Sequence, residues 1–290
     1  MTGEPGLDAT PEQPPAAEPA GHSPAGGSPA HHSPAGGSPA HHSLAGRRAL
    51  VTGSGGALGS RICLALAADG ASVAGLDVSA DAAAATTGRL AEAGAKARHA
   101  VVDLLDFDAL QGEVDAIAAD WGGIDILVNT AGGGMVRPFA ELTLDEWNSQ
   151  LARNLTSVFT ATRVVLPHMT AGRWGRIVTL SSIAAVRGGR LVRNATAYAA
   201  AKAGVIGLTK ALAIELAETG ITVNAIAPGA QQTPGRDRDT PQRREALLAQ
   251  IPTRTLGRPE DLAASVVFLC QDAAQYITGI TLAQDGGHSI

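Results

Sequence analysis

Tyr198 and Lys202 are the residues whose types and spacing point most directly to chemistry. They lie four residues apart in TAYAAAKAG, an alanine-rich stretch that predicts a helix, so their side chains share one helix face. A phenol normally loses its proton near pH ~10, and an adjacent ammonium group lowers that pKa by stabilising the phenolate. The pair therefore predicts a phenol that transfers a proton near neutral pH. A chance pair on a solvated helix face is the alternative unless the chain also supplies a cofactor site.

A serine can reach this phenol from the end of a neighbouring strand. The short apolar run at residues 177–180 ends in Ser181 and Ser182, as a buried parallel strand ends at a surface. Side chains alternate along a strand, so Ser182 is predicted to share a face with Leu180, whereas Ser181 points the other way. We expect Ser182 to hydrogen-bond the reacting oxygen, with Ser181 as the alternative.

A glycine-rich turn near residue 50 predicts a nucleotide site. The apolar strand at residues 49–52 leads directly into GSGGALG at residues 53–59, and an amphipathic helix follows over residues 60–68. Glycines let the backbone approach a pyrophosphate, which rests on the free N–H groups of the helix N-terminus. Glycines alone would also fit an ordinary turn, but the strand–turn–helix context favours phosphate binding.

Asp77 favours NAD over NADP as the nucleotide. It ends the predicted strand at residues 72–76 and lies eighteen residues beyond Gly59. An acidic residue at about that distance holds the adenosine ribose hydroxyls of NAD and repels the 2′-phosphate of NADP. Neither Gly56 nor Val78 offers a cation for that phosphate.

Strands and helices alternate along the rest of the chain. Asp103 ends one strand, where its side chain would point toward a ligand crevice, and Thr143 with Glu146 forms a capping box that opens a long helix. The order predicts an α/β fold, a single Rossmann-type doubly wound parallel sheet of about seven strands with helices on both faces. Further strands are predicted over residues 97–102, 124–128, 222–227 and 281–283, and helices over residues 80–93, 107–121 and 144–169.

Residues 1–45 form a separate low-complexity segment. The ten residues SPAGGSPAHH occur at residues 23–32 and again at residues 33–42. Such a segment has little to bury and is predicted to be a disordered tail, leaving residues 46–290 as the folded domain. Five of the chain's eight histidines lie in the tail, so weak metal binding is an alternative to a plain linker. An interaction module is another.

Composition and charge exclude several classes of function. The net charge is −5, of which four charges belong to the tail, so the body is nearly neutral and has no evident basic face for nucleic acid or an anionic membrane. Cys63 and Cys270 lie in apolar helical patterns and are predicted to be core residues. They provide no disulfide framework and no metal-ligand spacing. No signal peptide and no apolar run of membrane-spanning length is recognised, so the sequence predicts a soluble cytoplasmic protein without a metal site.

Taken together, these motifs resemble the classical short-chain dehydrogenase/reductase family over residues 47–287. One glycine motif would be weak evidence, but the ordered set is very specific. In the family's order the chain contains TGSGGALG at residues 52–59, Asp103, NTAG at residues 129–132, Asn154, Ser182, Tyr198 with Lys202, and PGAQQT at residues 228–233.

The resemblance implies an NAD-dependent oxidoreductase that interconverts a secondary alcohol and a ketone by hydride transfer, most often as a homotetramer. Tyr198 would be the general acid or base, Ser182 would orient the substrate oxygen, and Lys202 would bind the nicotinamide ribose and keep the pKa of the tyrosine low. Asn154 would hold a water that links Lys202 to solvent. The implied cofactor-binding residues are Gly53, Gly55, Ala57, Leu58, Gly59, Asp77, Asp103, Leu104, Asn129, Ala131, Gly132, Tyr198, Lys202, Pro228, Gly229 and Thr233.

The chain departs from the family pattern in three places. Ala57 stands where the family usually has a glycine, and Thr130 replaces the second asparagine of the usual NNAG turn. Ser182 and Tyr198 are sixteen residues apart, a few more than usual. The extra length falls at residues 187–193, which we expect to shape the substrate site.

The substrate is not readable from the sequence. PGAQQT has a faint likeness to dehydrogenases of ring cis-diols, whereas the body is as similar to reductases of 3-oxoacyl thioesters; another hydroxy compound is the remaining option. Four arginines near residue 240 could bind an anionic group of the substrate, or they could be solvated charges beside Asp237 and Asp239. They are Arg236, Arg238, Arg243 and Arg244.

A non-catalytic NAD-binding regulator or scaffold is the alternative function, although such a protein would be expected to lose Tyr198 or Lys202.

Overall fold

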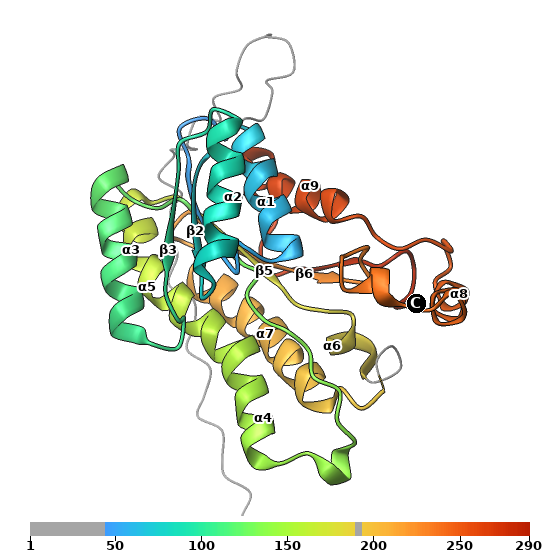
Figure 1. Cartoon of the computed structure of the whole chain (residues 1–290). Helices are drawn as coiled ribbons and strands as arrows, with labels where there is room; N and C mark the ends of the chain where they lie inside the picture. Colours follow the sequence, from blue (N-terminus) through green and yellow to red (C-terminus); the bar gives the residue numbers. More distant parts are fainter. Residues whose placement is uncertain (1–43, 189–192) are drawn as a thin grey trace, which may run out of the picture. The chain divides into compact units, whose positions relative to one another are not determined.

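The computed structural model describes residues 44–188 and 193–290, and in them seven strands form one parallel sheet. The strand order is β3-β2-β1-β4-β5-β6-β7, so the chain reverses its direction of travel across the sheet between β1 and β4. The predicted doubly wound α/β fold is therefore confirmed (Figure 1). The strands are β1 (Arg48–Thr52), β2 (Ser72–Asp77), β3 (Ala97–Val101), β4 (Ile126–Asn129), β5 (Gly175–Leu180), β6 (Ile221–Pro228) and β7 (Thr281–Gln284).

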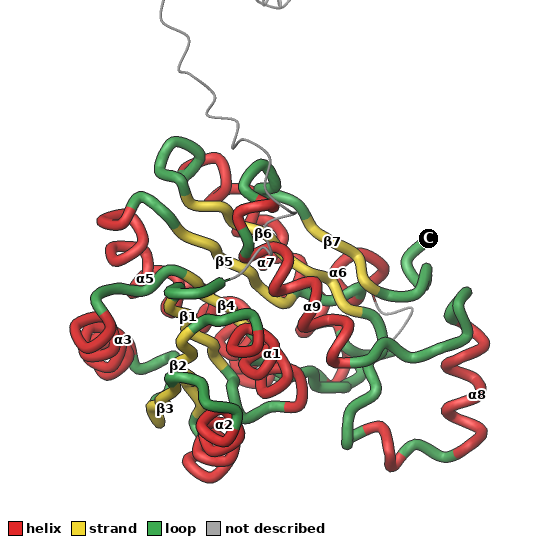
Figure 2. The backbone as a smooth tube through the Cα atoms, turned by 90° about the horizontal axis from the view of Figure 1, so that it is seen from above, coloured by secondary structure: helices red, strands yellow, loops and turns green. Residues whose placement is uncertain are grey.

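Helices cover both faces of the sheet because alternate strand residues supply two apolar surfaces. Leu50 and Leu127 point into one core with α3, α5 and α7, while Val51 and Val128 point into the other with α1, α2 and α9. Figure 2 shows α1, α2 and α9 on one side of the strands and α3 and α5 on the other. The helices are α1 (Ala57–Ala68), α2 (Ala80–Glu92), α3 (Phe107–Trp121), α4 (Leu144–Leu151), α5 (Ser157–Gly172), α6 (Ala184–Arg187), α7 (Thr196–Glu215), α8 (Pro241–Gln250) and α9 (Pro259–Cys270).

The long helix predicted over residues 144–169 is interrupted by one wide turn. The capping box at Thr143 and Glu146 opens α4 as predicted, but residues Ala152–Thr156 form a π-helical turn before α5 begins. The Asn154 side chain donates to the Gln150 carbonyl at 3.0 Å, and Ser157 Oγ donates to the Arg153 carbonyl at 2.7 Å. These side chains satisfy carbonyls in the widened turn, which places Arg153 and Asn154 beside the carboxyl ends of the strands.

The folded body begins at or before Leu44. This side chain is buried in the core with α1, and its backbone N–H donates to the Asp69 carbonyl at 2.8 Å. The predicted disordered tail, with its repeats and histidines, otherwise lies outside the described residues. Cys63 and Cys270 are buried, unpaired thiols whose burial raises each pKa to about 12, so they behave as core residues.

Helix α7 corrects one expectation from the sequence. At 20 residues it is long and apolar enough to cross a membrane by length and composition, so the prediction that no run reaches that length is wrong. The same helix packs its buried face on the sheet through Val205 and Ala213 and carries Lys202. A third of the apolar window is buried in the fold, and one such helix is weak evidence for a membrane span.

A buried ion pair joins β1 to the loop before β4. The Asp125 carboxylate accepts hydrogen bonds from Arg48 Nε at 2.6 Å, Arg48 Nη2 at 2.8 Å and the Arg48 backbone N–H at 2.8 Å. The Asp125 side chain is 9% exposed and that of Arg48 27% exposed. The Asp125 carboxylate therefore compensates the positive charge of a guanidinium that is only partly exposed to water.

Asp125→Ala is expected to lower the free energy of unfolding by about 2 kcal/mol, because it leaves the Arg48 guanidinium with backbone carbonyls but without its carboxylate partner. Urea denaturation measures the loss. Asp261→Ala is the matched control, since the Arg258–Asp261 pair is solvent-exposed and its removal is expected to cost far less. Equal losses in the two variants would contradict this assignment.

Candidate active site

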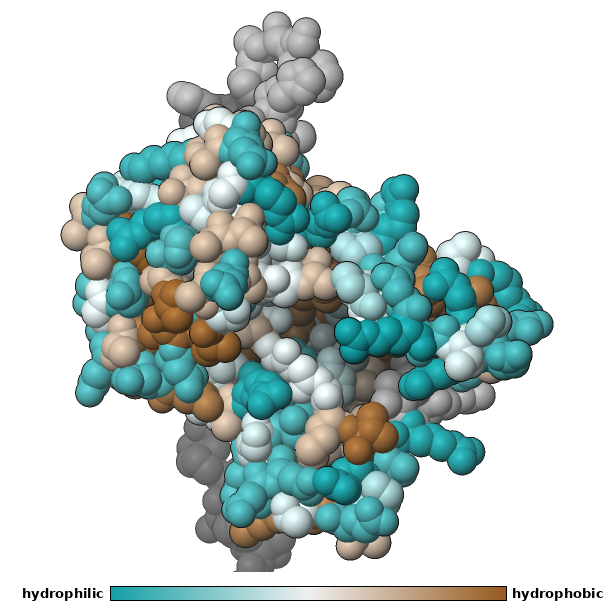
Figure 3. Space-filling model, in the orientation of Figure 1, coloured by the Kyte–Doolittle hydropathy of each residue, from teal (hydrophilic) through white to brown (hydrophobic). Residues whose placement is uncertain are grey.

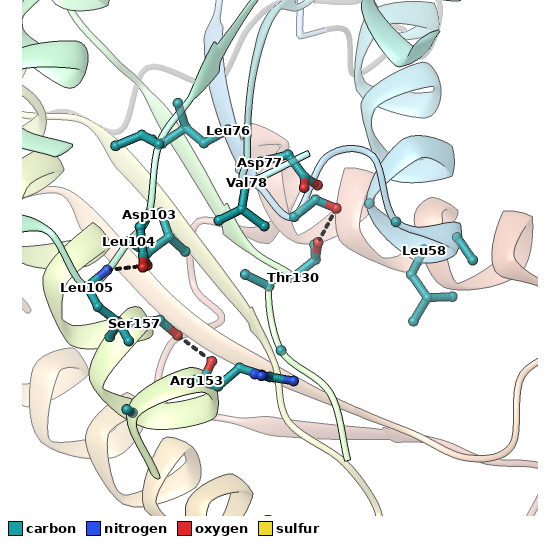
Figure 4. A pocket seen from close by; sticks show the side chains of 18 of the residues that line it. Leu58, Leu76, Asp77, Val78, Asp103, Leu104, Leu105, Thr130, Arg153 and Ser157 are labelled. Carbon is teal, nitrogen blue, oxygen red and sulfur yellow. Dashed lines mark hydrogen bonds between the residues drawn. The ribbon is translucent and has the colours of Figure 1, made fainter. Parts of the chain in front are cut away.

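A cavity of about 770 Å³ opens at the carboxyl ends of the central strands, where the chain reverses direction across the sheet. Open α/β sheets bind ligands at this switch point. Figure 4 shows Asp77, Asp103 and Thr130 projecting around the cavity from three strand ends, and Figure 3 shows a hollow near the centre of the same face of the molecule. The lining residues include Gly53, Ala57, Leu58, Gly59, Asp77, Asp103, Leu104, Ala131 and Gly132, all predicted from the sequence to bind the cofactor.

The glycine-rich turn forms one wall of this cavity and depends on two of its glycines. Gly53 has φ +65°, and a Cβ on Gly59 would lie 2.1 Å from the Gly53 carbonyl oxygen. Gly56 is the N-cap of α1 and provides no side-chain acceptor, and the first turn contains no acidic residue. The α1 N-terminus thus offers its N–H groups to an anion, which fits a dinucleotide pyrophosphate.

Asp77 is fixed in place at the end of β2. One carboxylate oxygen accepts from the Gly55 N–H at 2.9 Å and the other from the Ser79 N–H at 3.0 Å. Gly55 itself lies behind the turn, because a Cβ there would meet Ala82 at 2.4 Å. Gly55 is not among the residues that line the cavity, and its backbone acts on the site through Asp77.

Asp103 and Asn129 have different places at the neighbouring strand ends. Asp103 faces the cavity and accepts from the Leu105 N–H at 2.9 Å. Asn129 is buried and does not line the cavity; its amide donates to Thr179 at 3.2 Å and to Thr162 at 3.4 Å. Asn129 therefore supports the crevice from behind.

The unusual Thr130 ties β4 to β1. Its hydroxyl donates to the Thr52 carbonyl at 2.5 Å, and its N–H donates to Thr52 Oγ1 at 3.2 Å. A threonine thus fixes this turn where the family usually has an asparagine.

A second cavity of about 440 Å³ is lined by three of the four predicted catalytic residues, all but the buried Asn154. It shares Leu58, Thr130 and Gly132 with the first cavity, so the two are neighbours along one crevice. The predicted residues Ser182, Tyr198, Lys202, Pro228, Gly229 and Thr233 all line it, together with Ser181, Gln231 and Arg236.

Ser182 is the serine that meets the phenol. It lines the same cavity as Tyr198 and acts to lower the pKa of the phenol, and its Oγ accepts from the Ala184 N–H at 3.1 Å. Ser181 is turned away, because its hydroxyl is buried and donates to the Lys202 carbonyl at 2.9 Å. The structure therefore favours Ser182 over Ser181, as strand alternation predicts. Of the longer loop that follows, residues 189–192 lie outside the described residues.

The hydrogen bond of the Lys202 ammonium goes to the backbone rather than to the phenol oxygen. The ammonium donates to the Leu180 carbonyl at 2.7 Å and lies 6.0 Å from the centroid of the Tyr198 ring. Burial lowers the pKa of Lys202 to about 8. Burial also raises the pKa of Tyr198, an effect that the nearby Ser182 hydroxyl opposes. Lys202 is not among the causes of this shift, so its predicted lowering of the tyrosine pKa stays a prediction.

The pKa of Lys202 predicts a pH-dependent contribution to stability. Below pH 8 the amine is protonated in the folded and unfolded protein, and its burial destabilises the fold; as pH rises from about 8 toward ~10.4, only the folded state has lost the proton. Compared with Lys202→Met, the wild-type free energy of unfolding is therefore expected to rise over this range. Chemical denaturation at several pH values measures the difference between the two free energies of unfolding. The two buried thiols titrate in both proteins, so their contribution cancels in this difference. A difference that does not change with pH would contradict the assignment.

Asn154 is fully buried and clamps the turn after β4. Its Oδ1 accepts from the Gly133 N–H at 3.0 Å and its Nδ2 donates to the Gly133 carbonyl at 3.1 Å. The next glycine, Gly134, faces the Tyr198 ring, with 3.6 Å from the position of its absent Cβ to the ring. Asn154 thus holds the backbone that borders the phenol.

The four arginines near residue 240 divide between the two sequence interpretations. Arg236 and Arg243 both pair with Asp239 at 3.3 Å, as solvated or half-buried charges do, yet Arg236 also lines the cavity of Tyr198. Arg244 lies outside this cavity, on α8. Sequence reasoning missed Gln231 and Arg153 as lining residues. No sequence signal identified Arg153 as a lining residue, because the sequence predicted a regular helix and not the π-helical turn that places this side chain at the cavity.

Comparison with known proteins defines the class. The family model described as enoyl-(acyl carrier protein) reductase matches residues 54–289. The chain is 43% identical over 240 residues to nodulation protein G of Azospirillum brasilense, covering 82% of this chain and 96% of that protein. It is 39% identical over 242 residues to the 3-oxoacyl-[acyl-carrier-protein] reductase FabG of Escherichia coli strain K12, covering 83% and 97%.

Solved structures agree with this result. A crystal structure of a protein described as a short-chain alcohol dehydrogenase of Sinorhizobium meliloti 1021 superposes with a TM-score of 0.80 at 36% identity, covering 85% of this chain and 98% of that one. The chain belongs to the short-chain dehydrogenase/reductase family. It is therefore an oxidoreductase, and membership implies a nicotinamide cofactor and a small-molecule substrate.

Proposed function

We propose that this protein is an NAD-dependent dehydrogenase/reductase that interconverts a secondary alcohol and a ketone. The observation that carries the proposal is that Ser182 and Tyr198 line one cavity beside the glycine-rich crevice. A phenol and a hydroxyl that border the same cavity can both bind one further oxygen. A substrate carbonyl or alcohol oxygen fits that position.

The residues of the chain would divide the proton chemistry between them. In ketone reduction Tyr198 donates its proton to the substrate oxygen, and Ser182 hydrogen-bonds the same oxygen and orients it. The neutral phenol is the donating form, and burial favours that form. In alcohol oxidation Tyr198 accepts the proton. The bound nicotinamide supplies or accepts the hydride.

Lys202 and Asn154 would support this pair. Lys202 has two further ammonium hydrogens beyond the one donated to Leu180, and we assign them to the nicotinamide ribose. Asn154 holds the Gly133 backbone at the wall of the same cavity, and the water that links Lys202 to solvent is assigned to its neighbourhood. Pro228, Gly229 and Thr233 would border the nicotinamide, with Thr233 on its carboxamide.

NAD is proposed over NADP because of the surroundings of Asp77. Its carboxylate faces the cavity that would hold the adenosine ribose, and Val78 beside it is 70% exposed and uncharged. Among the described residues that line this cavity Arg153 is the only cation, and Figure 4 places it beyond Thr130 from Asp77. A 2′-phosphate beside Asp77 would therefore meet a like charge without compensation.

A 3-oxoacyl thioester is the first substrate to test, since the FabG relative is named for reducing that class. Ring cis-diols and other hydroxy compounds are the second group, from the resemblance of the PGAQQT segment. The experiment follows NADH and NADPH oxidation against 3-oxoacyl thioesters, quinones and simple ketones, and NAD⁺ reduction with diols and secondary alcohols. Turnover with NADH supports the proposal. Tight NADH binding without turnover of any compound would favour a non-catalytic NAD-binding regulator or scaffold.

We also propose a homotetramer, as the family resemblance implies. From charge and composition we propose that it is soluble and cytoplasmic, without nucleic-acid or membrane partners. Light scattering coupled to size exclusion measures the assembly. A monomer of about 29.3 kDa would contradict the tetramer.

A further inference from the structure

Arg153 enters the dinucleotide cavity from the side opposite the glycine-rich turn. It belongs to the π-helical turn between α4 and α5 and lines the cavity together with Gly56, Ala57 and Leu58. Figure 4 shows its side chain reaching into the cavity below Thr130 and pointing toward the side where Leu58 lies. The backbone of Arg153 is secured independently, because its carbonyl accepts from Ser157 Oγ at 2.7 Å.

The Arg153 guanidinium has no acceptor in the part of the chain that the structure describes. Its exposed side chain makes no ion pair or hydrogen bond with the described residues, whereas both acidic residues of the cavity are engaged with backbone N–H groups. Asp77 and Asp103 accept from the turns that follow their own strands. A guanidinium offers five donors in a planar fork that matches phosphate oxygens. Here those donors face a cavity lined with glycines.

The opposite wall supplies the second half of an anion site. The N-terminus of α1 lies at Ala57 and Leu58, with no side-chain cap and no acidic residue in its first turn. Helix N–H groups and the macrodipole favour a negative charge there. One anion lying between α1 and Arg153 would therefore be bound from both sides.

We infer that Arg153 binds the diphosphate of the nicotinamide dinucleotide, together with the N-terminus of α1. The inference rests on the proposed use of that cofactor and adds a residue that the family motifs do not contain. The π-helical turn gives the reason for its position, because it directs Asn154 inward to Gly133 and places the preceding Arg153 over the crevice. Arg153 is thus a cofactor-binding residue, separate from the proton-transfer residues.

Binding of three ligands, with and without a diphosphate, tests this assignment independently of catalytic activity. Dissociation constants of NADH, ADP-ribose and adenosine are measured by fluorescence titration and by competition with NADH, for wild type, Arg153→Gln and Arg153→Lys. Loss of a charge-assisted phosphate contact is expected to weaken NADH and ADP-ribose about tenfold in Arg153→Gln. Adenosine binding should be unchanged, and Arg153→Lys should recover part of the affinity.

Arg163→Gln is the matched control, since Arg163 is exposed on α5 and lies outside the cavity. It should bind all three ligands as the wild type does. Equal ADP-ribose affinity in wild type and Arg153→Gln would overturn the inference and leave the proposed function intact. An equal loss for adenosine would overturn it in favour of a contact with the nucleoside. A wild type that binds neither NADH nor ADP-ribose would contradict the proposed cofactor itself.

Discussion

Replacing Tyr198 by phenylalanine is expected to lower kcat by at least ~10³-fold in either direction of the reaction. The change removes only the hydroxyl, which shares its cavity with Ser182, so the proton donor is lost while the ring stays in place. General acid–base catalysis contributes typically ~10²–10⁴-fold, and the hydroxyl also helps to orient the substrate oxygen. The dissociation constant of NADH should change by less than about threefold, because the variant loses a transition-state interaction and keeps the cofactor crevice.

The chain provides its own control for this substitution. Tyr276, the only other tyrosine, is 99% exposed and lies far from the crevice in sequence and outside both cavities. Tyr276→Phe should retain wild-type kcat. Retained turnover in Tyr198→Phe would exclude the phenol as the proton donor. A drop in both variants would point to a general loss of fold rather than of chemistry.

Replacing Asp77 by asparagine is expected to shift the preference between NADH and NADPH by about a hundredfold toward NADPH, measured as the ratio of kcat/KM values. Asparagine keeps an oxygen for the Gly55 N–H but removes the charge that repels a 2′-phosphate. NADH should also bind more weakly, because a carboxylate accepts from two ribose hydroxyls better than a neutral amide does.

Asp81→Asn separates this effect from a general change of charge. Asp81 is exposed in the first turn of α2, four residues beyond Asp77, and does not line the cavity. Its substitution should leave the cofactor ratio unchanged. A wild type that already prefers NADPH would refute the assignment of Asp77, as would an unaltered ratio in Asp77→Asn.

The fold was predictable because its signals are local. Apolar strands such as β4 and β6 are buried on both faces, so they appear in sequence as continuous apolar runs between helical patterns. The glycine-rich turn was also predictable, because its glycines are required by the structure. Gly59 lies against the Gly53 carbonyl, where no side chain fits. The order of these elements then leaves only the doubly wound sheet.

The parts of the site that escaped prediction depend on contacts distant in sequence. The direction of the Tyr198 pKa follows from how completely the surrounding elements bury the phenol, and the Lys202 ammonium is held by the Leu180 carbonyl of another element. Helical spacing places the two side chains on one face, but it predicts neither the direction of the Tyr198 pKa shift nor the acceptor of the Lys202 ammonium. The π-helical turn likewise depends on Asn154 binding Gly133, twenty-one residues away, and this contact brings Arg153 to the cavity.

Deuterium transfer to a ketone or 3-oxoacyl thioester, from NADH that carries deuterium at both C4 positions, shows directly whether the nicotinamide hydride reaches the product. Mass spectrometry of the alcohol product reports the transferred label and is independent of any absorbance change. We expect a labelled alcohol from the wild type and Tyr276→Phe, and none above background from Tyr198→Phe. Labelled product formed equally by Tyr198→Phe would contradict the role of the phenol, and unlabelled alcohol from the wild type would contradict hydride transfer from the nicotinamide.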